Sequence, residues 1–267
     1  MIMGILNVTP DSFAGSVPTM DPGVALDTAL QMEADGADLI DVGGESTRPG
    51  AVPVTVEEEL ARIQPVLRAL AGRLRIPLSV DTSKASVARA GLEAGAAIVN
   101  DVTGLRHGPA LAQVVAAGGA ALVLMHSRGT PGTMQSEATY RNLVPEVAEE
   151  IRAGIGAATE AGVPVGSIIV DPGVGFAKQP QHSYGVLARL AELAETLDRP
   201  VLVGPSRKSF MRSALGERPA AERDWGTAAA VTAAVLAGAH IVRVHAVSEM
   251  VQVVRVAEQI RRHGLPL

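Results

Sequence analysis

Cysteine is absent from this sequence, and aromatic residues make up only 2% of it. The first absence excludes disulfides, thiolate zinc sites and a cysteine nucleophile. The formal net charge is −5, and we expect no nucleic-acid partner, because such a surface needs a basic face and stacking rings. No uninterrupted apolar run is long enough to span a bilayer. We therefore expect a globular, cytoplasmic enzyme that has no membrane partner.

A recurring pattern divides the chain into similar units. A helical stretch ends in a turn of small residues, a short apolar run follows, and that run closes on a polar residue, as in "ADGADLIDVGGE", "EAGAAIVNDVTG" and "LAGAHIVRVHAV". Glycine suits the left-handed residue after a helix, and apolar runs of this length suit strands buried on both faces. The pattern predicts eight strands, near residues 2–7, 38–43, 76–81, 97–101, 120–125, 167–170, 200–204 and 240–244.

Eight strand–helix units in 267 residues fit a (β/α)₈ barrel, the TIM-barrel class of α/β fold, better than an open sheet. No Pro/Gly/Ser-rich linker and no charge run divides the chain, so we expect one domain over residues 1–267. The less regular stretches 10–23 and 126–143 predict long loops over the carboxyl ends of the strands. Active sites of this fold lie at that end.

The sequence also predicts where some helices begin. The stretch 55–74 predicts a helix that opens with a capping box, because its first threonine is followed three residues later by a glutamate. Pro65 inside this stretch predicts a kink, since proline removes one backbone donor. Closer to the amino terminus, Asp21 and Pro22 predict the cap and the first residue of another helix.

The segment "IVRVHAV", residues 241–247, is apolar except for Arg243 and His245. These residues are two apart, so on one pleated strand they share a face. A salt bridge at the domain surface is one explanation. The other is that both side chains meet an anion, because two groups that are or can become cationic are costly to bury without one.

Polar residues end several other predicted strands, and each taken alone also has a structural explanation. Asp81 can cap the next helix, and Asp171 can form an Asx turn. Lys208 can be a solvated lysine, and His126 can be a satisfied core histidine. In a barrel, however, all these strand ends meet at one mouth. The set that gathers there is Asn7, Glu45, Arg48, Asp81, Asn100, His126, Asp171, Lys208, Arg243 and His245.

This set of side chains divides into two chemical groups. The carboxylates and the amide that end the third, fourth and sixth predicted strands suit a flat, donor-rich nitrogen heterocycle. The cationic groups, together with Asn7, suit an anion with or without a metal ion. The set therefore predicts a substrate that carries a heterocycle at one end and a phosphate or diphosphate at the other.

Nine motifs, in this order, resemble those of the dihydropteroate synthase family nearly end to end. They are "MGILNVTPDSF", "DVGGESTRPGA", "SVDTSK", "VNDVTG", "LVLMH…RGTPGTMQ", "DPGVGFAK", "SRKSF", "WGTAAA" and "RVHAV". The resemblance implies a (β/α)₈ barrel and a transferase of folate biosynthesis. That enzyme joins 6-hydroxymethyl-7,8-dihydropterin diphosphate to p-aminobenzoate by an SN1-like displacement and releases pyrophosphate. A magnesium ion, a homodimer and the role of sulfonamide target are implied as well.

The same resemblance implies roles for individual residues. The pterin would be held by Asp81, Asn100, Met125, Asp171, Phe176 and Lys208. The diphosphate and its magnesium ion would be held by Asn7, Arg48, Arg243 and His245, with Asn7 as the metal ligand. The p-aminobenzoate pocket, under loops 10–20 and 44–53, would be shaped by Phe13, Thr47, Pro49 and Ser209. The catalytic residues would be Asp81, Lys208 and Arg243.

One departure from the family pattern lies in the first loop. Family members commonly read "SFSDGG" where this chain reads "SFAGSV", so Gly15 stands in place of an aspartate. Glycine raises the entropy cost of ordering a loop, and it offers no carboxylate to offset that cost. We therefore expect less favourable loop closure and a higher KM for p-aminobenzoate than in relatives.

Other functions of a barrel are possible, and single features of the sequence weigh against some of them. A methyltetrahydrofolate:corrinoid methyltransferase would share the pterin end but needs no diphosphate site, so Arg48 and Arg243 count against it. A Schiff-base aldolase would use Lys208 with a depressed amine pKa. A zinc amidohydrolase would need a His-x-His pair on the first strand, and this chain has none. A non-catalytic pterin-binding module would be expected to have lost the phosphate residues.

Overall fold

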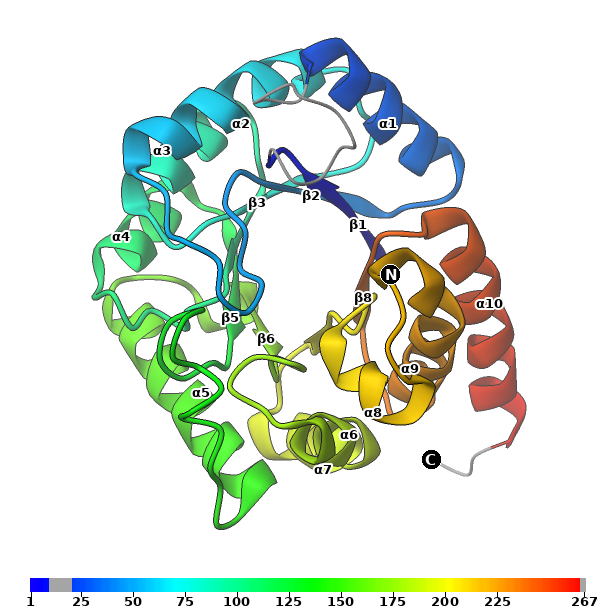
Figure 1. Cartoon of the computed structure of the whole chain (residues 1–267). Coiled ribbons are helices and arrows are strands. Elements are labelled where there is room, and N and C mark those ends of the chain that lie inside the picture. Colours follow the sequence, from blue (N-terminus) through cyan, green and yellow to red (C-terminus); the bar gives the residue numbers. More distant parts are fainter. Residues whose placement is uncertain (10–20, 265–267) are drawn as a thin grey trace.

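Eight parallel strands form a ring, and helices cover its outer face (Figure 1). The computed structural model describes residues 1–9 and 21–264. Neighbouring strands pair in the order β6-β5-β4-β3-β2-β1-β8-β7, and a parallel bridge between Val170 and Val201 joins the two ends. This closed parallel arrangement confirms the predicted (β/α)₈ barrel. The strands are β1 (Ile2–Asn7), β2 (Leu39–Gly43), β3 (Leu78–Asp81), β4 (Ile98–Asp101), β5 (Ala121–Met125), β6 (Ile168–Asp171), β7 (Leu202–Val203) and β8 (Ile241–Val244).

Strand β7 differs most from its predicted extent, because it is shorter than the stretch 200–204. Pro200 and Pro205 flank it, and proline has no backbone N–H to donate to a neighbouring strand. The backbone N–H of Val201 donates to Nδ1 of His240 at 3.1 Å instead of to a strand carbonyl. The remaining strands lie within two residues of their predicted bounds.

Helices alternate with the strands and form the outer layer of the barrel (Figure 1). They are α1 (Pro22–Ala34), α2 (Val56–Leu70), α3 (Ala85–Glu93), α4 (Ala110–Gly118), α5 (Leu143–Glu160), α6 (Pro180–Ala188), α7 (Leu190–Leu197), α8 (Arg212–Leu215), α9 (Asp224–Leu236) and α10 (Val247–Gly264). Among the described helices, none is long and apolar enough to cross a membrane. The stretch 126–142 contains no helix or strand, which confirms the predicted long loop between β5 and α5.

The predicted helix starts are confirmed by their caps. The Thr55 hydroxyl accepts a hydrogen bond from the Glu58 backbone N–H at 3.2 Å and begins α2. The Asp21 carboxylate accepts from the backbone N–H of Gly23 at 2.8 Å and begins α1. Helix α2 ends at Leu70, so the prediction that it continues to residue 74 was wrong. Pro65 lies inside α2, and the kink expected there stays a prediction.

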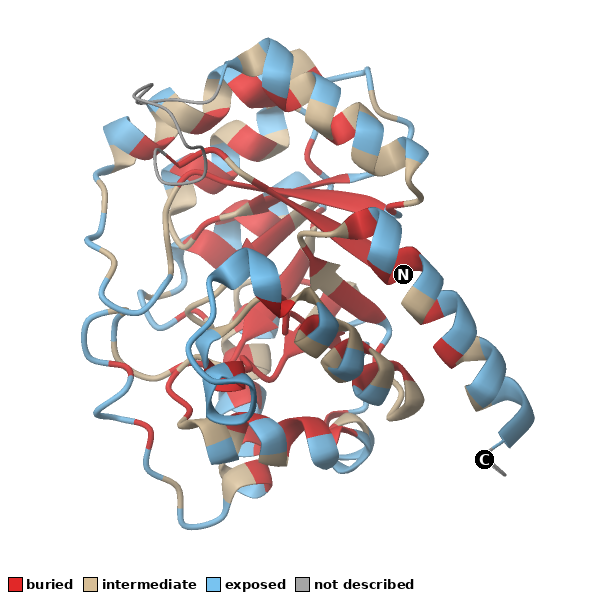
Figure 2. Ribbon diagram, turned by 45° about the vertical axis from the view of Figure 1, so that its right-hand side comes forward, coloured by how far each residue is buried: buried red, intermediate tan, exposed pale blue. Residues whose placement is uncertain are grey.

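The inside of the ring has an apolar floor. Figure 2 shows that the strands are buried almost throughout. Most buried apolar residues pack between strands and helices, whereas a small separate cluster fills the ring; it consists of Met3, Leu39, Val123, Leu202 and Ile241. Because side chains alternate along a strand, the next inward-facing residue lies two positions further on. Above Leu39 and Ile241, and above Ile98 and Ile169, which pack against the same cluster, these next residues are polar. They are Asp41, Arg243, Asn100 and Asp171, and they form a polar layer directly above the floor.

Candidate active site at the barrel mouth

The polar layer brings together four of the residues predicted for the site. Asp81 of β3 pairs in register with Asn100 of β4, and Asp171 of β6 pairs with Met125 of β5. Arg243 of β8 lies two residues above the floor residue Ile241. All of these positions face inward by the alternation of the strands. The structure therefore gathers Asp81, Asn100, Asp171 and Arg243 at the carboxyl end of the barrel.

The first charged group of the layer, called the arginine cluster here, consists of Asp41, Asp81 and Arg243. The Arg243 guanidinium donates from Nε to Oδ2 of Asp41 at 2.6 Å and from Nη2 to Oδ2 of Asp81 at 2.7 Å. Burial raises the pKa of Asp81 to about 7, although the Arg243 charge lowers it. Two carboxylates of the chain itself thus face Arg243, so the salt-bridge explanation considered for it applies, but inside the barrel mouth and not at the domain surface.

Asp41 was missed by sequence reasoning. It is fully buried on β2, and its Oδ1 has no hydrogen-bond partner in the described part of the chain. Its Oδ2 accepts from the Asn100 side-chain amide at 2.9 Å. Because an ionised carboxylate only accepts, this contact fixes the amide of Asn100 and leaves its carbonyl oxygen as an acceptor. The available signal was the period of two that places Asp41 above Leu39.

His245 lies one residue beyond the end of β8. Its Nδ1 is 2.9 Å from the Ser206 hydroxyl. Burial, together with the charges of Arg243, Arg207 and Arg48, lowers the pKa of His245 to about 3. The imidazole is therefore neutral near pH 7, in a place where three guanidinium groups converge. Such convergence favours an anion.

Two of the three arginines near His245 differ in how they are held. Arg207 has a left-handed backbone, with φ at 58°, and both its Nε and Nη2 donate to Asp224 at 2.7 Å. Arg48 is exposed, and its guanidinium has no hydrogen bond or ion pair with residues 1–9 or 21–264. Arg48 is thus the cation in this region that is free to meet a ligand.

The second charged group, called the lysine cluster here, consists of Asp171, Lys178 and Lys208. Asp171 accepts a hydrogen bond from the Gly173 backbone N–H at 2.7 Å, so the Asx turn considered above does form. Burial raises the pKa of Asp171, and the charges of Lys208 and Lys178 lower it. Burial also lowers the pKa of Lys208 to about 8 and that of Lys178 to about 7. The aldolase alternative required such a depressed amine, so pKa alone does not separate it from the leading function.

Lys208 and Phe176, two of the residues predicted for the site, are in contact with each other. The Lys208 amine donates to the Val174 carbonyl at 2.5 Å and lies 4.3 Å from the centroid of the Phe176 ring. A cation at this distance from a ring face is attracted by the ring quadrupole. Met125 is buried beside Asp171 in the β5–β6 register. The predicted pterin residues are therefore neighbours in space.

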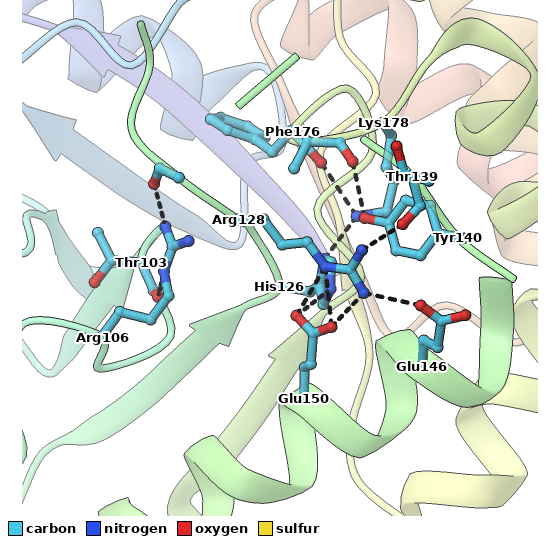
Figure 3. A network of polar contacts seen from close by, with 12 residues as sticks. Thr103, Arg106, His126, Arg128, Thr139, Tyr140, Glu146, Glu150, Phe176 and Lys178 are labelled. Carbon is cyan, nitrogen blue, oxygen red and sulfur yellow. Dashed lines mark hydrogen bonds and ion pairs between the residues drawn. The ribbon is translucent and has the colours of Figure 1, made fainter. Parts of the chain in front are cut away.

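His126 is neither isolated nor free. Its Nε2 is 3.1 Å from Oε2 of Glu150, and its Nδ1 is 2.8 Å from Nζ of Lys178 (Figure 3). The structural explanation considered for His126, a satisfied core histidine, fits these contacts. Lys178 was not singled out from the sequence, because nothing in "DPGVGFAK" indicates that its last side chain returns to the interior.

The loop 44–53 is tied to the barrel by the side chain of Glu45. Its Oε1 accepts from the Val54 backbone N–H at 3.1 Å, and its Oε2 accepts from Nζ of Lys84 at 2.6 Å. The same amine donates to Glu59, a fully buried carboxylate, at 2.5 Å. Both ends of the loop are thereby held by one ion-paired carboxylate. Lys84 and Glu59 were also missed by sequence reasoning.

The remaining predicted site residues lie at the rim. Asn7 is the last residue of β1 and Ser209 is exposed in a short turn after β7, whereas Thr47 is half-buried and Pro49 is exposed. The prediction for Phe13 and that for Gly15 fall in residues 10–20, outside the described residues. The described residues contain no group of three or more His, Cys, Asp or Glu side chains that could hold a metal ion.

Comparison with known proteins identifies the family. The family model described as "Pterin binding enzyme" matches residues 3–245. The dihydropteroate synthase of Synechocystis sp. is 44% identical over 98% of this chain and 90% of its own length. The dihydropteroate synthase of Escherichia coli is also 44% identical, over 96% of this chain and 90% of its own length.

Solved structures give the same family. The dihydropteroate synthase of Yersinia pestis in complex with a sulfonamide drug has a TM-score of 0.91 and is 41% identical, covering 98% of this chain and 93% of its own. The Xanthomonas albilineans enzyme with 4-aminobenzoic acid has a TM-score of 0.90 and is 40% identical, covering 99% and 93%. This chain is therefore a pterin binding enzyme that belongs to the dihydropteroate synthase family.

Proposed function

We propose that this chain condenses 6-hydroxymethyl-7,8-dihydropterin diphosphate with p-aminobenzoate to 7,8-dihydropteroate, releasing pyrophosphate. One observation carries the proposal. A layer of buried carboxylate, amide and amine groups lies above an apolar floor, beside a convergence of three arginines. The first region suits a heterocycle rich in donors and acceptors, and the second suits a diphosphate. The proposed alkyl transfer needs both in one site, because its substrate carries a pterin at one end and a diphosphate at the other.

The pterin would bind over the lysine cluster and Asn100. Asp171 offers a carboxylate that can accept from neighbouring ring N–H groups, and Lys208 offers a donor on the same side. The Asn100 carbonyl oxygen remains available, because its amide is held by Asp41. The Met125 and Phe176 side chains would pack against the faces of the ring.

The diphosphate would bind among Asn7, Arg48, Arg243 and His245. Arg48 has no competing partner in the described chain, whereas Arg243 would exchange at least one of its two aspartates for the ligand. The magnesium ion would arrive with the substrate, because the described residues offer no group of three or more His, Cys, Asp or Glu side chains to hold it alone, and Mg²⁺ commonly keeps waters and uses substrate phosphates as ligands. Asn7 would supply one oxygen ligand, and the ion would neutralise charge on the leaving pyrophosphate.

The reaction would follow an SN1-like course. The bond from the pterin methylene to the diphosphate oxygen breaks early, and pyrophosphate leaves with the electron pair. Arg243 would stabilise the departing charge, and Asp81 would stabilise the cation that is left on the pterin. The p-aminobenzoate nitrogen then bonds to the methylene and releases a proton. Lys208 would orient the ring and form no covalent bond with it.

The p-aminobenzoate ring would enter from the rim, between Thr47, Pro49 and Ser209, with Phe13 from the first loop. Support comes from the relative crystallised with 4-aminobenzoic acid. Loop 44–53 carries Thr47 and Pro49 and is tied down by Glu45. The homodimer and the cytoplasmic location stay predictions from the sequence.

Pyrophosphate release tests the proposed function. The purified chain is incubated with pterin diphosphate and p-aminobenzoate in magnesium buffer, and both pyrophosphate and dihydropteroate are measured. We expect equal amounts of the two products, and none when p-aminobenzoate is omitted. Borohydride added during turnover should trap no adduct on Lys208. A substrate-dependent mass increase on Lys208 would favour the aldolase alternative and overturn the mechanism.

A further inference from the structure

Lys178 is a fully buried amine that the proposed mechanism does not use. Its side chain extends from the turn after β6 toward the end of β5 (Figure 3). The Nζ atom is 2.8 Å from Nδ1 of His126 and donates to the Phe176 carbonyl at 3.2 Å. A buried amine is costly unless its donors are satisfied, and these contacts satisfy two of them.

The contact with His126 has a defined direction. The Glu150 carboxylate faces Nε2 of His126 at 3.1 Å, and an ionised carboxylate can only accept. Nε2 therefore carries the proton, and Nδ1 accepts from Lys178. Burial and the Lys178 charge together lower the pKa of His126 to about 4, so the imidazole is neutral near pH 7. Lys178 thus holds one tautomer of His126 in place.

Further contacts lead from Glu150 through Arg128 and Tyr140 back to the turn that carries Lys178. Arg128 donates to Glu150 at 3.0 Å, and its guanidinium carbon lies 4.1 Å from the centroid of the Tyr140 ring. The Tyr140 hydroxyl donates to the Ala177 carbonyl at 2.8 Å. A closed ring of contacts results, and its members are Lys178, His126, Glu150, Arg128, Tyr140 and Ala177. Such a ring restrains the turn from both sides (Figure 3).

The turn itself needs this restraint. Ala177 has φ at 44°, a left-handed conformation that costs a non-glycine residue about 1 kcal/mol or more. Gly173 has φ at 67°, and a Cβ there would lie 1.9 Å from the His126 carbonyl oxygen. Between these residues lie the Val174 carbonyl and the Phe176 ring, the two groups that contact Lys208. The position of Lys208 therefore depends on the shape of the turn.

The charge of Lys178 also acts on Asp171, a residue proposed to bind the pterin. The charged and titratable groups around it are His126, Asp171, Lys208, Glu150, Arg128 and His182. Burial is the largest cause that lowers the pKa of Lys178, and the Asp171 charge opposes it. In return, Lys178 favours the ionised form of Asp171. One amine thus acts on Asp171 by charge and on Lys208 through the turn.

We propose that Lys178 is a positioning residue of the pterin subsite: it fixes the turn 173–178 against His126, and so sets Phe176, the Val174 carbonyl and Lys208 for the ring. This inference rests on the proposed function, because the ligand concerned is the pterin. It separates the two substrates, since the side chains of Thr47, Pro49 and Ser209, proposed for p-aminobenzoate, form no hydrogen bond or ion pair with this network.

Replacing Lys178 tests the inference. In Lys178→Met we expect the Kd for the pterin diphosphate, measured by calorimetry without p-aminobenzoate, to rise roughly 10- to 100-fold. The KM for p-aminobenzoate at saturating pterin should stay within about twofold, because loop 44–53 is held separately. Lys178→Gln keeps a donor without the charge, and we expect a smaller rise of roughly threefold to tenfold. Arg189→Met removes an exposed cation and should change neither constant.

Each outcome decides between the alternatives. A folded Lys178→Met or Lys178→Gln protein with wild-type pterin affinity would overturn the inference. So would equal losses for pterin and p-aminobenzoate, or failure of both variants to fold, because these indicate a purely structural lysine. If wild-type protein binds no pterin diphosphate, it is the proposed function that fails.

Discussion

The two charged clusters at the barrel mouth have opposite compositions. In the arginine cluster one cation lies between two carboxylates, and both carboxylates bond directly to it. In the lysine cluster one carboxylate lies between two amines, and the amines bond elsewhere, Lys208 to Val174 and Lys178 to His126. Oδ1 of Asp171 accepts from the Gly173 backbone N–H, and its Oδ2 has no hydrogen bond or ion pair with residues 1–9 or 21–264.

This difference separates a closed cluster from an open one. In the arginine cluster both carboxylates bond to Arg243, so a ligand must compete with Asp41 or Asp81 for the guanidinium, although Oδ1 of Asp41 has no hydrogen-bond partner in the described chain. In the lysine cluster neither amine bonds to Asp171, so a ligand can bind the free carboxylate oxygen of Asp171 without breaking an ion pair. We infer that the pterin ring meets a preformed subsite and that the diphosphate meets one that must rearrange.

Arg243→Ala should produce the largest loss of stability, because it leaves two buried carboxylates without their cation. We expect the free energy of unfolding to fall by about 3–5 kcal/mol. Affinity for the pterin diphosphate should also fall by about 2–4 kcal/mol, with a far smaller effect on p-aminobenzoate. Denaturant titration and calorimetry measure the two effects.

A double variant provides the control for this prediction. Asp41→Asn together with Arg243→Met should cost less than the sum of the single changes, because the pair is coupled. Strict additivity, or a loss below about 1 kcal/mol for Arg243→Ala, would mean that the cluster is not a closed ion-paired unit.

Gly173→Ala should damage the lysine cluster next most strongly. A Cβ at Gly173 would lie 1.9 Å from the His126 carbonyl oxygen, so the turn must shift; we expect a loss above about 3 kcal/mol and weak pterin binding. Gly72→Ala is a matched control, since Gly72 has the same φ of 67° and nothing within 4 Å of the added Cβ. That control should cost only about 1 kcal/mol. Equal costs at the two sites would show that the turn is not held against β5.

Stability should depend on pH in opposite directions for the two clusters. Asp81 has a folded pKa of about 7, above its unfolded value of about 4, so the folded state binds more protons and stability falls as pH rises from 4 to 7. Lys178 has a folded pKa of about 7, below its unfolded value of about 10.5, so stability rises with pH above 7.

Denaturant titrations at several pH values measure these slopes. Asp81→Asn should reduce the fall between pH 4 and 7, to which Asp171 also contributes. Lys178→Met should reduce the rise by about 2 kcal/mol between pH 7 and 9, and Lys208 should account for the rise that remains. If Asp81→Asn instead changed the slope above pH 7, and Lys178→Met the slope between pH 4 and 7, the assignment of the two slopes to these residues would be contradicted.

Glu45→Ala should have the smallest effect and should concern only the rim. It frees both ends of loop 44–53, so we expect the KM for p-aminobenzoate to rise roughly tenfold. The pterin Kd should stay within about twofold. Glu57→Ala removes a neighbouring exposed carboxylate and should leave both constants unchanged. A rise in pterin Kd with Glu45→Ala would mean that the two subsites are not independent.

Much of the fold could be predicted because its signals are local. Apolar runs, small-residue turns and caps such as Asp21 all act within a few residues of the chain. Asp81, Asn100 and Asp171 could be placed for the same reason, since each lies at the end of an apolar run and all such ends meet in a barrel.

Other parts of the site depend on distant contacts. Arg243 bonds to Asp41 and Asp81, which lie 202 and 162 residues away in the sequence. The sequence therefore left a salt bridge and an external anion both open for Arg243, and it could not name Asp41 as a partner. Lys178 returns to the interior through the left-handed backbone of Ala177, and alanine gives no local signal for that conformation.

Direct binding to the isosteric variant Asp171→Asn tests the central claim, that the open lysine cluster recognises the pterin. Calorimetry with the pterin diphosphate and no p-aminobenzoate compares wild type, Asp171→Asn and the exposed-carboxylate control Glu192→Gln. We predict that Asp171→Asn raises the Kd about 100-fold, because the charged acceptor is lost, and that Glu192→Gln binds like wild type. An Asp171→Asn protein that is folded and binds the pterin diphosphate as tightly as wild type would contradict the claim.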